Sequence, residues 1–405
     1  MLTFDEKTRY SRHLLLPEFG ENGQRRLKES SVLVVGAGGL GSGALMYMAA
    51  AGIGRIGIVE FDTVDASNLH RQILYGTDDV GASKLSVASR RLRDINPLID
   101  IELYEERLTS ENALDLISDY DIVADGTDNF ATRYLVNDAC VLTCTPNVFA
   151  SIFRFDGQLA VFGAEDGPCY RCLFPQPPPA GPVPSCAEGG LLGVLPGILG
   201  TLQATEVIKM LAGLGEPLIG KMLLIDALTM HFKTLRISQD VECAVCGERP
   251  TIGKLIDYES FCAGIDTSDP AGRSQSLPEP LDSPPQTSTE SNNLLFSPQV
   301  SLIDVHQLKE IRESGEDFLL LDVRQPEELS IADIGGVSVP MNELPERLDE
   351  VAPDKKQKIV VMCRSGVRSA NVAAWLGKQD YENVLSLDGG ILAWSQFIDP
   401  TIAVY

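Results

Sequence analysis

The sequence lacks a hydrophobic leader, because Met1 is followed closely by Asp5 and Glu6. A secretory signal needs an apolar core of roughly 7–15 residues, so we expect no export. An unbroken apolar run is also missing. The longest uncharged stretch, 189–205, is slightly short of a membrane span and contains Pro196 and five glycines. We therefore expect a buried helix with a kinked start there, no membrane partner, and a cytoplasmic protein.

Positive charge is scarce, since 33 Lys and Arg face 57 Asp and Glu, for a net charge of -24. Such a surface repels nucleic acid and anionic lipid, so neither is expected as a direct partner.

The nine cysteines are an odd number, and a cytosolic chain seldom builds a disulfide framework. Their spacing therefore favours metal binding or thiol chemistry.

The organisation is of the α/β class, with no internal repeat. Apolar runs at 32–35, 56–59, 122–124 and 223–225 predict short strands, and the stretches 43–51 and 84–95 have helical composition. This alternation predicts a largely parallel sheet covered by helices. Residues 264–298 are rich in Pro, Ser, Thr, Asp and Glu and predict a flexible linker. The expected domains are thus 1–263 and 299–405, the second again with strands and helices.

A glycine-rich turn follows the first apolar run. Gly36, Gly38 and Gly41 form a G-x-G-x-x-G pattern between a strand and a helix. Such a turn lets the backbone and the helix N-terminus approach a phosphate. Glu60 ends the next strand, at the distance expected for a ribose-binding carboxylate. These features predict a Rossmann-like nucleotide site but do not separate NAD from ATP.

Three further segments favour ATP. Ser67–Gln72 is polar, Lys84 opens a helix, and Asp128–Asn129 follow a strand. Arg71 and Lys84 could neutralise a triphosphate and Asp128 could hold Mg²⁺, neither of which hydride transfer needs. Taken singly, Lys84 is also typical of a solvated helix and Asp128–Asn129 of a turn.

GAGGLG, EFD, SNLHRQ, Lys84 and TDN, in this order, resemble the ubiquitin-activating-like adenylyltransferases of the MoeB/ThiF type over residues 9–249. The resemblance implies that Arg12 reaches into the site of a dimer partner, and that Glu60 replaces the family's usual Asp on a longer arm. It also implies the following contacts to ATP or its metal: Gly39, Glu60, Ser67, Asn68, Leu69, His70, Arg71, Lys84, Asp128 and Asn129.

The cysteines fall into two C-x-x-C pairs and several single residues. Cys169–Cys172 and Cys243–Cys246 predict a closed four-thiolate site for structural Zn²⁺, which the resemblance also implies; redox or free cysteines are the alternative. Cys186 lies in a Pro- and Gly-rich loop. A lone loop cysteine is usually passive, but the resemblance implies that it captures the activated carrier as a thioester or acyl-disulfide. The remaining three, Cys140, Cys144 and Cys262, are expected to be buried apolar residues.

Cys363 follows an apolar strand and precedes a short loop and a helix. Backbone N–H groups, the helix N-terminus, Arg364 and Arg368 would favour a thiolate or a persulfide there. Four residues separate Cys363 from Arg368, one fewer than in cysteine phosphatases, so the loop suits a single sulfur atom better. The loop, with LLLDVRQPEE, GGVSVP and LDGGILAW, resembles the rhodanese family, although Asp333 stands where many members have His.

An adenylating module joined to a rhodanese module resembles the molybdopterin-synthase adenylyltransferase/sulfurtransferase family. This resemblance implies that a small ubiquitin-like sulfur carrier (MoaD/ThiS-like) with a Gly-Gly end is adenylylated at its C-terminus. A Cys363 persulfide, charged by a cysteine desulfurase or thiosulfate, then yields a thiocarboxylate for molybdenum cofactor biosynthesis or tRNA thiolation. Catalysis would rest on Cys363, Cys186 and Arg71, in a homodimer. The alternatives are a nucleotide sensor with a partner-docking rhodanese-like domain, and an NAD-dependent oxidoreductase.

Overall fold

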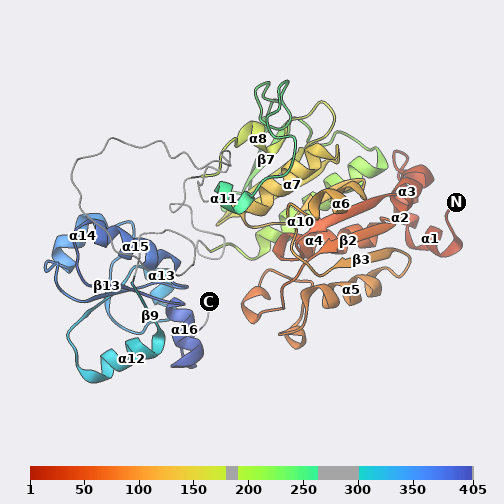
Figure 1. Cartoon of the computed structure of the whole chain (residues 1–405). Coiled ribbons are helices and arrows are strands. Elements are labelled where there is room, and N and C mark those ends of the chain that lie inside the picture. The colour runs from red at the N-terminus through yellow and green to blue at the C-terminus, as the bar shows by residue number, and fades with distance from the viewer. Residues whose placement is uncertain (179–189, 263–300, 404–405) are drawn as a thin grey trace. The chain divides into compact units, whose positions relative to one another are not determined.

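The computed structural model describes residues 1–178, 190–262 and 301–403. The chain divides into two compact units, Met1–Gly272 and Arg273–Tyr405, each of which is described by itself (Figure 1). The predicted linker 264–298 and Cys186 lie outside the described residues. The domain boundaries at 263 and 298 therefore stay predictions.

The first unit is built on an eight-stranded sheet with the order β3-β2-β1-β4-β5-β6-β7-β8. The strands are β1 (Ser31–Val35), β2 (Arg55–Val59), β3 (Asp100–Tyr104), β4 (Ile122–Asp125), β5 (Asn147–Phe153), β6 (Asp156–Phe162), β7 (Lys221–Asp226) and β8 (His231–Arg236). Pairing is parallel from β3 to β5 and antiparallel from β5 to β8. The expectation of a largely parallel sheet therefore holds for the half that contains the glycine-rich turn, whereas the predicted strand 223–225 is antiparallel.

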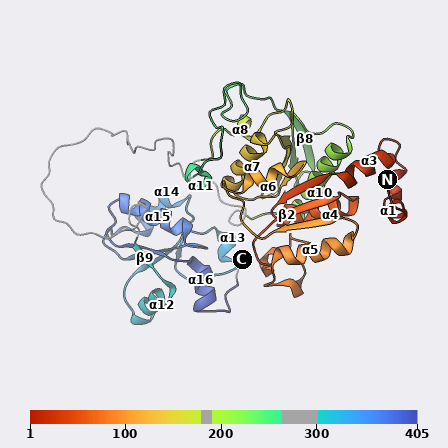
Figure 2. The same ribbon diagram turned by 45° about the vertical axis from the view of Figure 1, so that its right-hand side comes forward.

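Helices cover both faces of this sheet (Figures 1 and 2). They are α1 (Phe4–Arg9), α2 (Ser11–Leu14), α3 (Gly20–Glu29), α4 (Gly39–Ala51), α5 (Lys84–Ile95), α6 (Ala113–Ser118), α7 (Phe130–Leu142), α8 (Tyr170–Leu173), α10 (Val194–Ala212) and α11 (Tyr258–Cys262), with 3-10 turns at Ala66–Asn68 and Thr77–Asp79. Side chains alternate along β1, so that Val32 and Val34 pack towards α4 and α10 while Leu33 and Val35 pack towards α6 and α7. Burial on both faces explains why β1 is apolar throughout.

Helix α10 is the segment that the uncharged stretch predicts. Within the described residues it is the one helix long and apolar enough to span a bilayer. It packs instead in the protein interior, where Gln203 donates hydrogen bonds to the carbonyl oxygens of Asp125 and Val148. A Cβ on Gly200 would lie 2.2 Å from the Leu40 carbonyl oxygen of α4, so the two helices meet at backbone contact. Pro196 stands in the first turn, where proline is tolerated.

The second unit contains a parallel five-stranded sheet with the order β11-β10-β12-β13-β9. Its strands are β9 (Ser301–Ile303), β10 (Leu319–Asp322), β11 (Val337–Ser338), β12 (Ile359–Met362) and β13 (Val384–Leu387), and its helices are α12 (Val305–Ser314), α13 (Pro326–Leu329), α14 (Leu344–Val351), α15 (Val367–Lys378) and α16 (Gly390–Phe397). Apolar clusters lie on both faces of the central strand β12. The second unit is therefore also α/β, as predicted.

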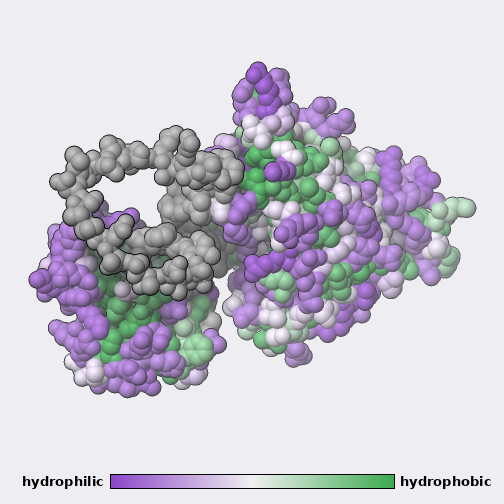
Figure 3. Space-filling model, in the orientation of Figure 1, coloured by the Kyte–Doolittle hydropathy of each residue, from purple (hydrophilic) through white to green (hydrophobic). Residues whose placement is uncertain are grey.

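Polar side chains predominate on the visible face of both units (Figure 3), in keeping with the net charge of -24. The single cysteines differ from expectation. Cys140 is buried as predicted, but Cys262 is only half-buried and Cys144 is exposed. Cys144 lies in the turn after α7 with a φ of 56°, and this turn carries its side chain away from the core.

Candidate active site

The order of the strands opens a crevice in the first unit. The chain leaves β1 for β2 on one side and reaches β4 on the other, and ligands bind at such switch points in α/β sheets. A cavity of about 970 Å³ lies at this point. Predicted site residues that line it are Gly36, Gly38, Gly39, Glu60, Arg71, Lys84, Asp128 and Asn129.

The glycine-rich turn has the conformation that its sequence predicts. Gly36 has a φ of 92°, and a Cβ on Gly41 would lie 2.1 Å from the Gly36 carbonyl oxygen. The turn is held from behind by Tyr75, whose hydroxyl donates to the Ala37 carbonyl oxygen at 2.8 Å. Helix α4 starts at Gly39, four residues earlier than predicted, so its N-terminus meets the cavity directly.

Glu60 is 6% exposed and ties β2 to this turn. One carboxylate oxygen accepts from the Ala37 N–H at 3.0 Å, and the other accepts from the N–H groups of Phe61 and Asp62. The longer arm of Glu thus reaches across to the glycine-rich turn. Because a carboxylate has about four acceptor positions, the side chain can still accept from a ribose hydroxyl.

Two cations line the cavity. Lys84 begins α5, is 5% exposed, and its Nζ lies 3.2 Å from Oδ2 of Asp62. Arg71 is half-buried and donates to the Ser67 carbonyl oxygen at 3.0 Å and to Oδ1 of Asn68 at 2.8 Å. Both lie beside the glycine-rich turn, where phosphate charge would be neutralised.

The rest of the polar run Ser67–Gln72 plays a different part in the structure. Among the cavity-lining residues, only Arg71 and Gln72 come from it. Asp65 accepts from the Ser67 N–H and hydroxyl, and Nδ1 of His70 lies 2.9 Å from the Ser67 carbonyl oxygen. Leu69 packs against the core. The turn therefore orients Arg71, and direct ATP contacts by Ser67, Asn68, Leu69 and His70 stay predictions, as does the role of the exposed Arg12 on α2.

The loop after β4 brings a carboxylate to the cavity wall. Asp128 is exposed and lines the cavity, and Asn129 caps α7 by accepting from the Thr132 N–H at 2.9 Å. Asp125 is fully buried and accepts from the N–H and hydroxyl of Thr127, while burial raises the pKa of its carboxyl. The buried Asp125 shapes the loop, and Asp128 is one of the exposed carboxylates of the lining; its role as a metal ligand stays a prediction.

Sequence reasoning missed three parts of the cavity wall, which are the segments 106–111 and 254–259 and the side chain of Arg133. Residues 254–259 line it, and the Ser110 hydroxyl donates to the Ile256 carbonyl oxygen at 2.6 Å. Arg133 of α7 also lines it. The stretch 254–259 mixes apolar and charged residues and has no motif that would reveal its place. Arg133, in contrast, lies in the first turn of the helix that follows TDN, which was an available signal.

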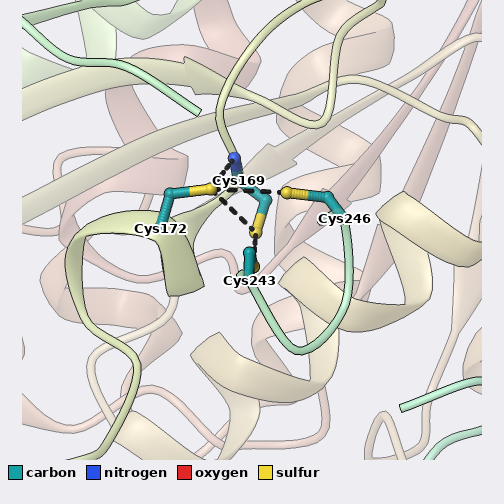
Figure 4. A group of neighbouring side chains, drawn as sticks. All are labelled: Cys169, Cys172, Cys243 and Cys246. Carbon is teal, nitrogen blue, oxygen red and sulfur yellow. Dashed lines mark hydrogen bonds between the residues drawn. The ribbon is translucent and has the colours of Figure 1, made fainter. Parts of the chain in front are cut away.

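The four paired cysteines converge from two distant segments (Figure 4). Their sulfur atoms all lie within 4.8 Å of one another, with Cys169–Cys243 at 3.5 Å and Cys172–Cys246 at 3.3 Å. A tetrahedral zinc with Zn–S bonds of about 2.3 Å has sulfur–sulfur edges of about 3.8 Å. The donor set and its size therefore fit Zn²⁺, with no position left for a substrate.

The cysteine cluster is joined to the cavity wall by a buried network. Arg171, between Cys169 and Cys172, donates two hydrogen bonds of 2.8 Å to Asp138 of α7. The Tyr258 hydroxyl donates to the same carboxylate at 2.8 Å. Because Tyr258 belongs to the wall segment, the cluster, α7 and the wall form one packed assembly.

The thiol of Cys363 lies at the end of β12 and is 1% exposed. Its Sγ accepts from the Gly366 N–H at 3.2 Å and lies 3.5 Å from the Ser369 hydroxyl, which Ser386 in turn contacts at 2.9 Å. Gly366 has a φ of 96°, so the loop turns back over the sulfur before α15 begins. This cradle can hold a single anionic sulfur atom.

Arg368 was expected to add positive charge beside Cys363, but the structure pairs it with a carboxylate. Its guanidinium makes a two-pronged ion pair with Glu328, at 2.7 and 2.6 Å. Both side chains are largely buried, so the carboxylate offsets much of the charge of Arg368. No local signal indicated this pairing, which joins residues 40 positions apart.

Comparison with known proteins gives the family. The ThiF family model matches residues 10–245, and the rhodanese-like domain model matches residues 304–397. The chain belongs to the ThiF family. This ThiF-family chain is 43% identical to the probable adenylyltransferase/sulfurtransferase MoeZ of Mycobacterium tuberculosis, over 100% of this chain and 96% of that protein.

Two other relatives are similar to this ThiF-family chain, one over its whole length and one over part of it. It is 43% identical to the adenylyltransferase and sulfurtransferase MOCS3 of Sus scrofa, over 100% of this chain and 89% of that protein. It is 56% identical to the sulfur carrier protein adenylyltransferase of Thermus thermophilus, over 64% of this chain and 98% of that protein. The chain is therefore an enzyme that joins an adenylyltransferase to a sulfurtransferase.

A solved structure shares the fold of the ThiF unit. The crystal structure of E. coli MccB with ATP has a TM-score of 0.51 and 25% identity, and the match covers 59% of this chain and 74% of that one. The likeness shows that the first unit shares its fold with a protein that has been crystallised with ATP.

Proposed function

We propose that this enzyme adenylylates the C-terminal glycine of a small ubiquitin-like sulfur carrier (MoaD/ThiS-like) and then converts that end to a thiocarboxylate. The observation that carries the proposal is the presence, in one chain, of a nucleotide cavity at the sheet switch point and of the sulfur cradle around Cys363. Relatives named for both activities, along their whole length, support it. The product would serve molybdenum cofactor biosynthesis or tRNA thiolation in the cytoplasm.

The first step is adenylyl transfer, which the site promotes by positioning the reactants and neutralising phosphate charge. A carboxylate oxygen of the carrier attacks the α-phosphorus of ATP, and pyrophosphate leaves with the electron pair of the broken P–O bond. Lys84, Arg71 and the N-terminus of α4 stabilise the charge that builds on the phosphates. Asp128 would hold Mg²⁺, which neutralises the leaving pyrophosphate, and Glu60 would hold the ribose. An arginine of a second copy, Arg12 of the partner subunit, would complete the site in a homodimer.

The second step moves sulfur. A cysteine desulfurase or thiosulfate leaves a persulfide on Cys363, and its outer sulfur attacks the carbonyl carbon of the acyl adenylate, displacing AMP. A second thiol, for which we propose Cys186, then attacks Sγ of Cys363 and releases the thiocarboxylate. The disulfide that remains is reopened by an external thiol reductant.

A direct test is to incubate the chain with a Gly-Gly-ended carrier, Mg-ATP and thiosulfate, and to follow the carrier by mass spectrometry. We expect an adenylate first and then the exchange of one oxygen for sulfur at the C-terminus. With ATP omitted, the carrier should stay unchanged. No adenylate on any such carrier would contradict the proposed function.

The cysteine cluster is expected to hold one zinc ion per chain that supports the fold without taking part in either step. Cys246→Ser should abolish bound zinc, measured by plasma mass spectrometry. It should also lower the thermal midpoint by roughly 10 °C, from a loss of about 3 kcal/mol at about 2–4 °C per kcal/mol. The control is Cys144→Ser, which removes an exposed thiol. Equal zinc content in both variants would argue against this ligand set.

A further inference from the structure

One buried cation in the nucleotide cavity has no role in the chemistry described above. Arg133 lies in the first turn of α7, is 8% exposed, and lines the cavity. Removing a guanidinium from water is costly unless an anion faces it. The contacts of Arg133 therefore decide whether it is a structural residue or a ligand-binding one.

The contacts of Arg133 compensate its charge only in part, through the Tyr170 side chain and the field of the Asp125 carboxylate. One Nη donates weakly to the Thr127 carbonyl oxygen at 3.4 Å, and the guanidinium carbon lies 5.1 Å from the centre of the Phe149 ring and 6.0 Å from that of Tyr170. Its Nε has no hydrogen-bond partner, and within 1–178, 190–262 and 301–403 it forms no ion pair. Asp125 accepts from Thr127 through Oδ1, and its Oδ2 has no hydrogen-bond partner. The Arg133 charge lowers the pKa of this carboxyl, but burial raises it overall, so Asp125 offsets the charge of Arg133 only in part.

Arg171 shows how this unit treats a structural arginine. It is equally buried, but Asp138 accepts two hydrogen bonds from it at 2.8 Å, and the rings of Tyr134 and Phe261 cover its guanidinium carbon at 4.7 and 4.6 Å. Arg133 belongs to α7, whereas Arg171 binds Asp138 of that helix from outside. Of the two, Arg133 alone lines the cavity. The difference indicates that the anion for Arg133 comes from a ligand.

The proposed reaction brings two anions into this cavity, a triphosphate and a carboxylate. The phosphates already have Lys84, Arg71, the N-terminus of α4 and a metal on Asp128. A cavity of about 970 Å³ is at the upper end of the roughly 300–1,000 Å³ found for ligand sites, which leaves room for a peptide tail beside a nucleotide. A planar guanidinium matches the two oxygens of a carboxylate better than an ammonium does.

We propose that Arg133 binds the C-terminal carboxylate of the carrier tail and holds it for attack on the α-phosphate. This inference rests on the proposed function and adds a binding residue to it. Arg133 would lose most of its hold once the carboxylate becomes the neutral acyl group of the adenylate, whose remaining charge lies on the phosphate, so it favours the bound acid over the product of the first step.

The test compares two forms of one carrier, ending in glycine acid or in glycine amide, for binding to the full chain with a non-hydrolysable ATP analogue. The wild-type chain should bind the acid about 10- to 100-fold more tightly than the amide, the range for a hydrogen-bonded charge. Arg133→Gln should bind both forms equally, and its affinity for the ATP analogue should be unchanged. Arg133→Lys should restore part of the preference, because it keeps the charge without the planar fork.

Arg91→Gln is the matched control, because Arg91 is an exposed arginine of α5, and it should keep the full preference for the acid. Three results would overturn the inference: a wild-type chain that binds acid and amide equally, an Arg133→Gln chain that keeps the preference, or an equal loss of affinity for the ATP analogue. The first needs no variant, so it applies even if Arg133→Gln does not fold. If instead the wild-type chain bound no carrier in either form, the proposed function itself would fail.

Discussion

Replacing Cys363 by alanine should abolish thiocarboxylate formation while leaving carrier-dependent ATP–pyrophosphate exchange at the wild-type rate. Cys363 supplies the atom that carries the sulfur, and loss of a covalent nucleophile commonly costs more than 1,000-fold. The adenylation residues all belong to the other compact unit, so their geometry does not depend on this side chain. Both rates can be measured on one preparation, the first by mass spectrometry of the carrier and the second with labelled pyrophosphate.

Cys144→Ala is the matched control for Cys363→Ala. Cys144 is exposed and lies in the adenylating unit, so its loss removes a thiol without touching the cradle, and both rates should persist. Thiocarboxylate formed by the Cys363→Ala chain at the wild-type rate would rule out Cys363 as the sulfur donor.

Lys84→Met should have the converse effect and slow adenylation by about 100- to 1,000-fold, the usual cost of removing one preorganised group that stabilises transition-state charge. Its buried ammonium lies beside the glycine-rich turn, where a loss of charge cannot be made up by water. Methionine has a similar length, and the partner Asp62 is half exposed, so the fold should persist. ATP–pyrophosphate exchange measures the first step, and sulfur transfer from thiosulfate to cyanide measures the second unit alone.

The control for Lys84→Met is Arg91→Met on the exposed side of the same helix, which should exchange pyrophosphate normally. Sulfur transfer to cyanide should be equal in all three chains. If Lys84→Met exchanged pyrophosphate as fast as Arg91→Met, the cation would have no part in adenylation.

Local sequence patterns predicted the centre of the eight-stranded sheet well. The expected strands 32–35, 56–59 and 122–124 lie within one residue of β1, β2 and β4, because parallel strands buried on both faces are continuously apolar. Lys84–Ile95 was predicted to its ends, since Ser83 caps α5 and the chain leaves the helix at Asn96. The glycine-rich turn was predicted because glycine between a strand and a helix has few other uses. Lys84 was predicted as a phosphate ligand because a lysine that opens a helix can neutralise the charge of a triphosphate.

Other features depend on tertiary contacts that no local pattern encodes. Strand β8 is exposed along its whole length, so it has no apolar alternation to reveal it. Whether Arg133 or Arg171 meets a carboxylate depends on how α7 packs against distant segments. The same is true of Glu328, which could not be linked to Arg368 from spacing alone. For each arginine the residue type can be read from the sequence, whereas the fold decides which carboxylate, if any, lies beside it.

The cysteine cluster has a consequence for the order in which the chain can acquire its structure during synthesis. Cys169 and Cys243 are separated by 74 positions, and β7, β8 and α10 all lie between them. A ribosome that has made the first pair must still make this whole stretch before the second pair can meet it. Non-local closures of this kind form late, and Tyr258 follows later still. The segment that closes the nucleotide cavity is therefore made after all four cysteines. If the cluster holds zinc as proposed, a shortage of zinc should leave this part of the adenylating unit the least complete.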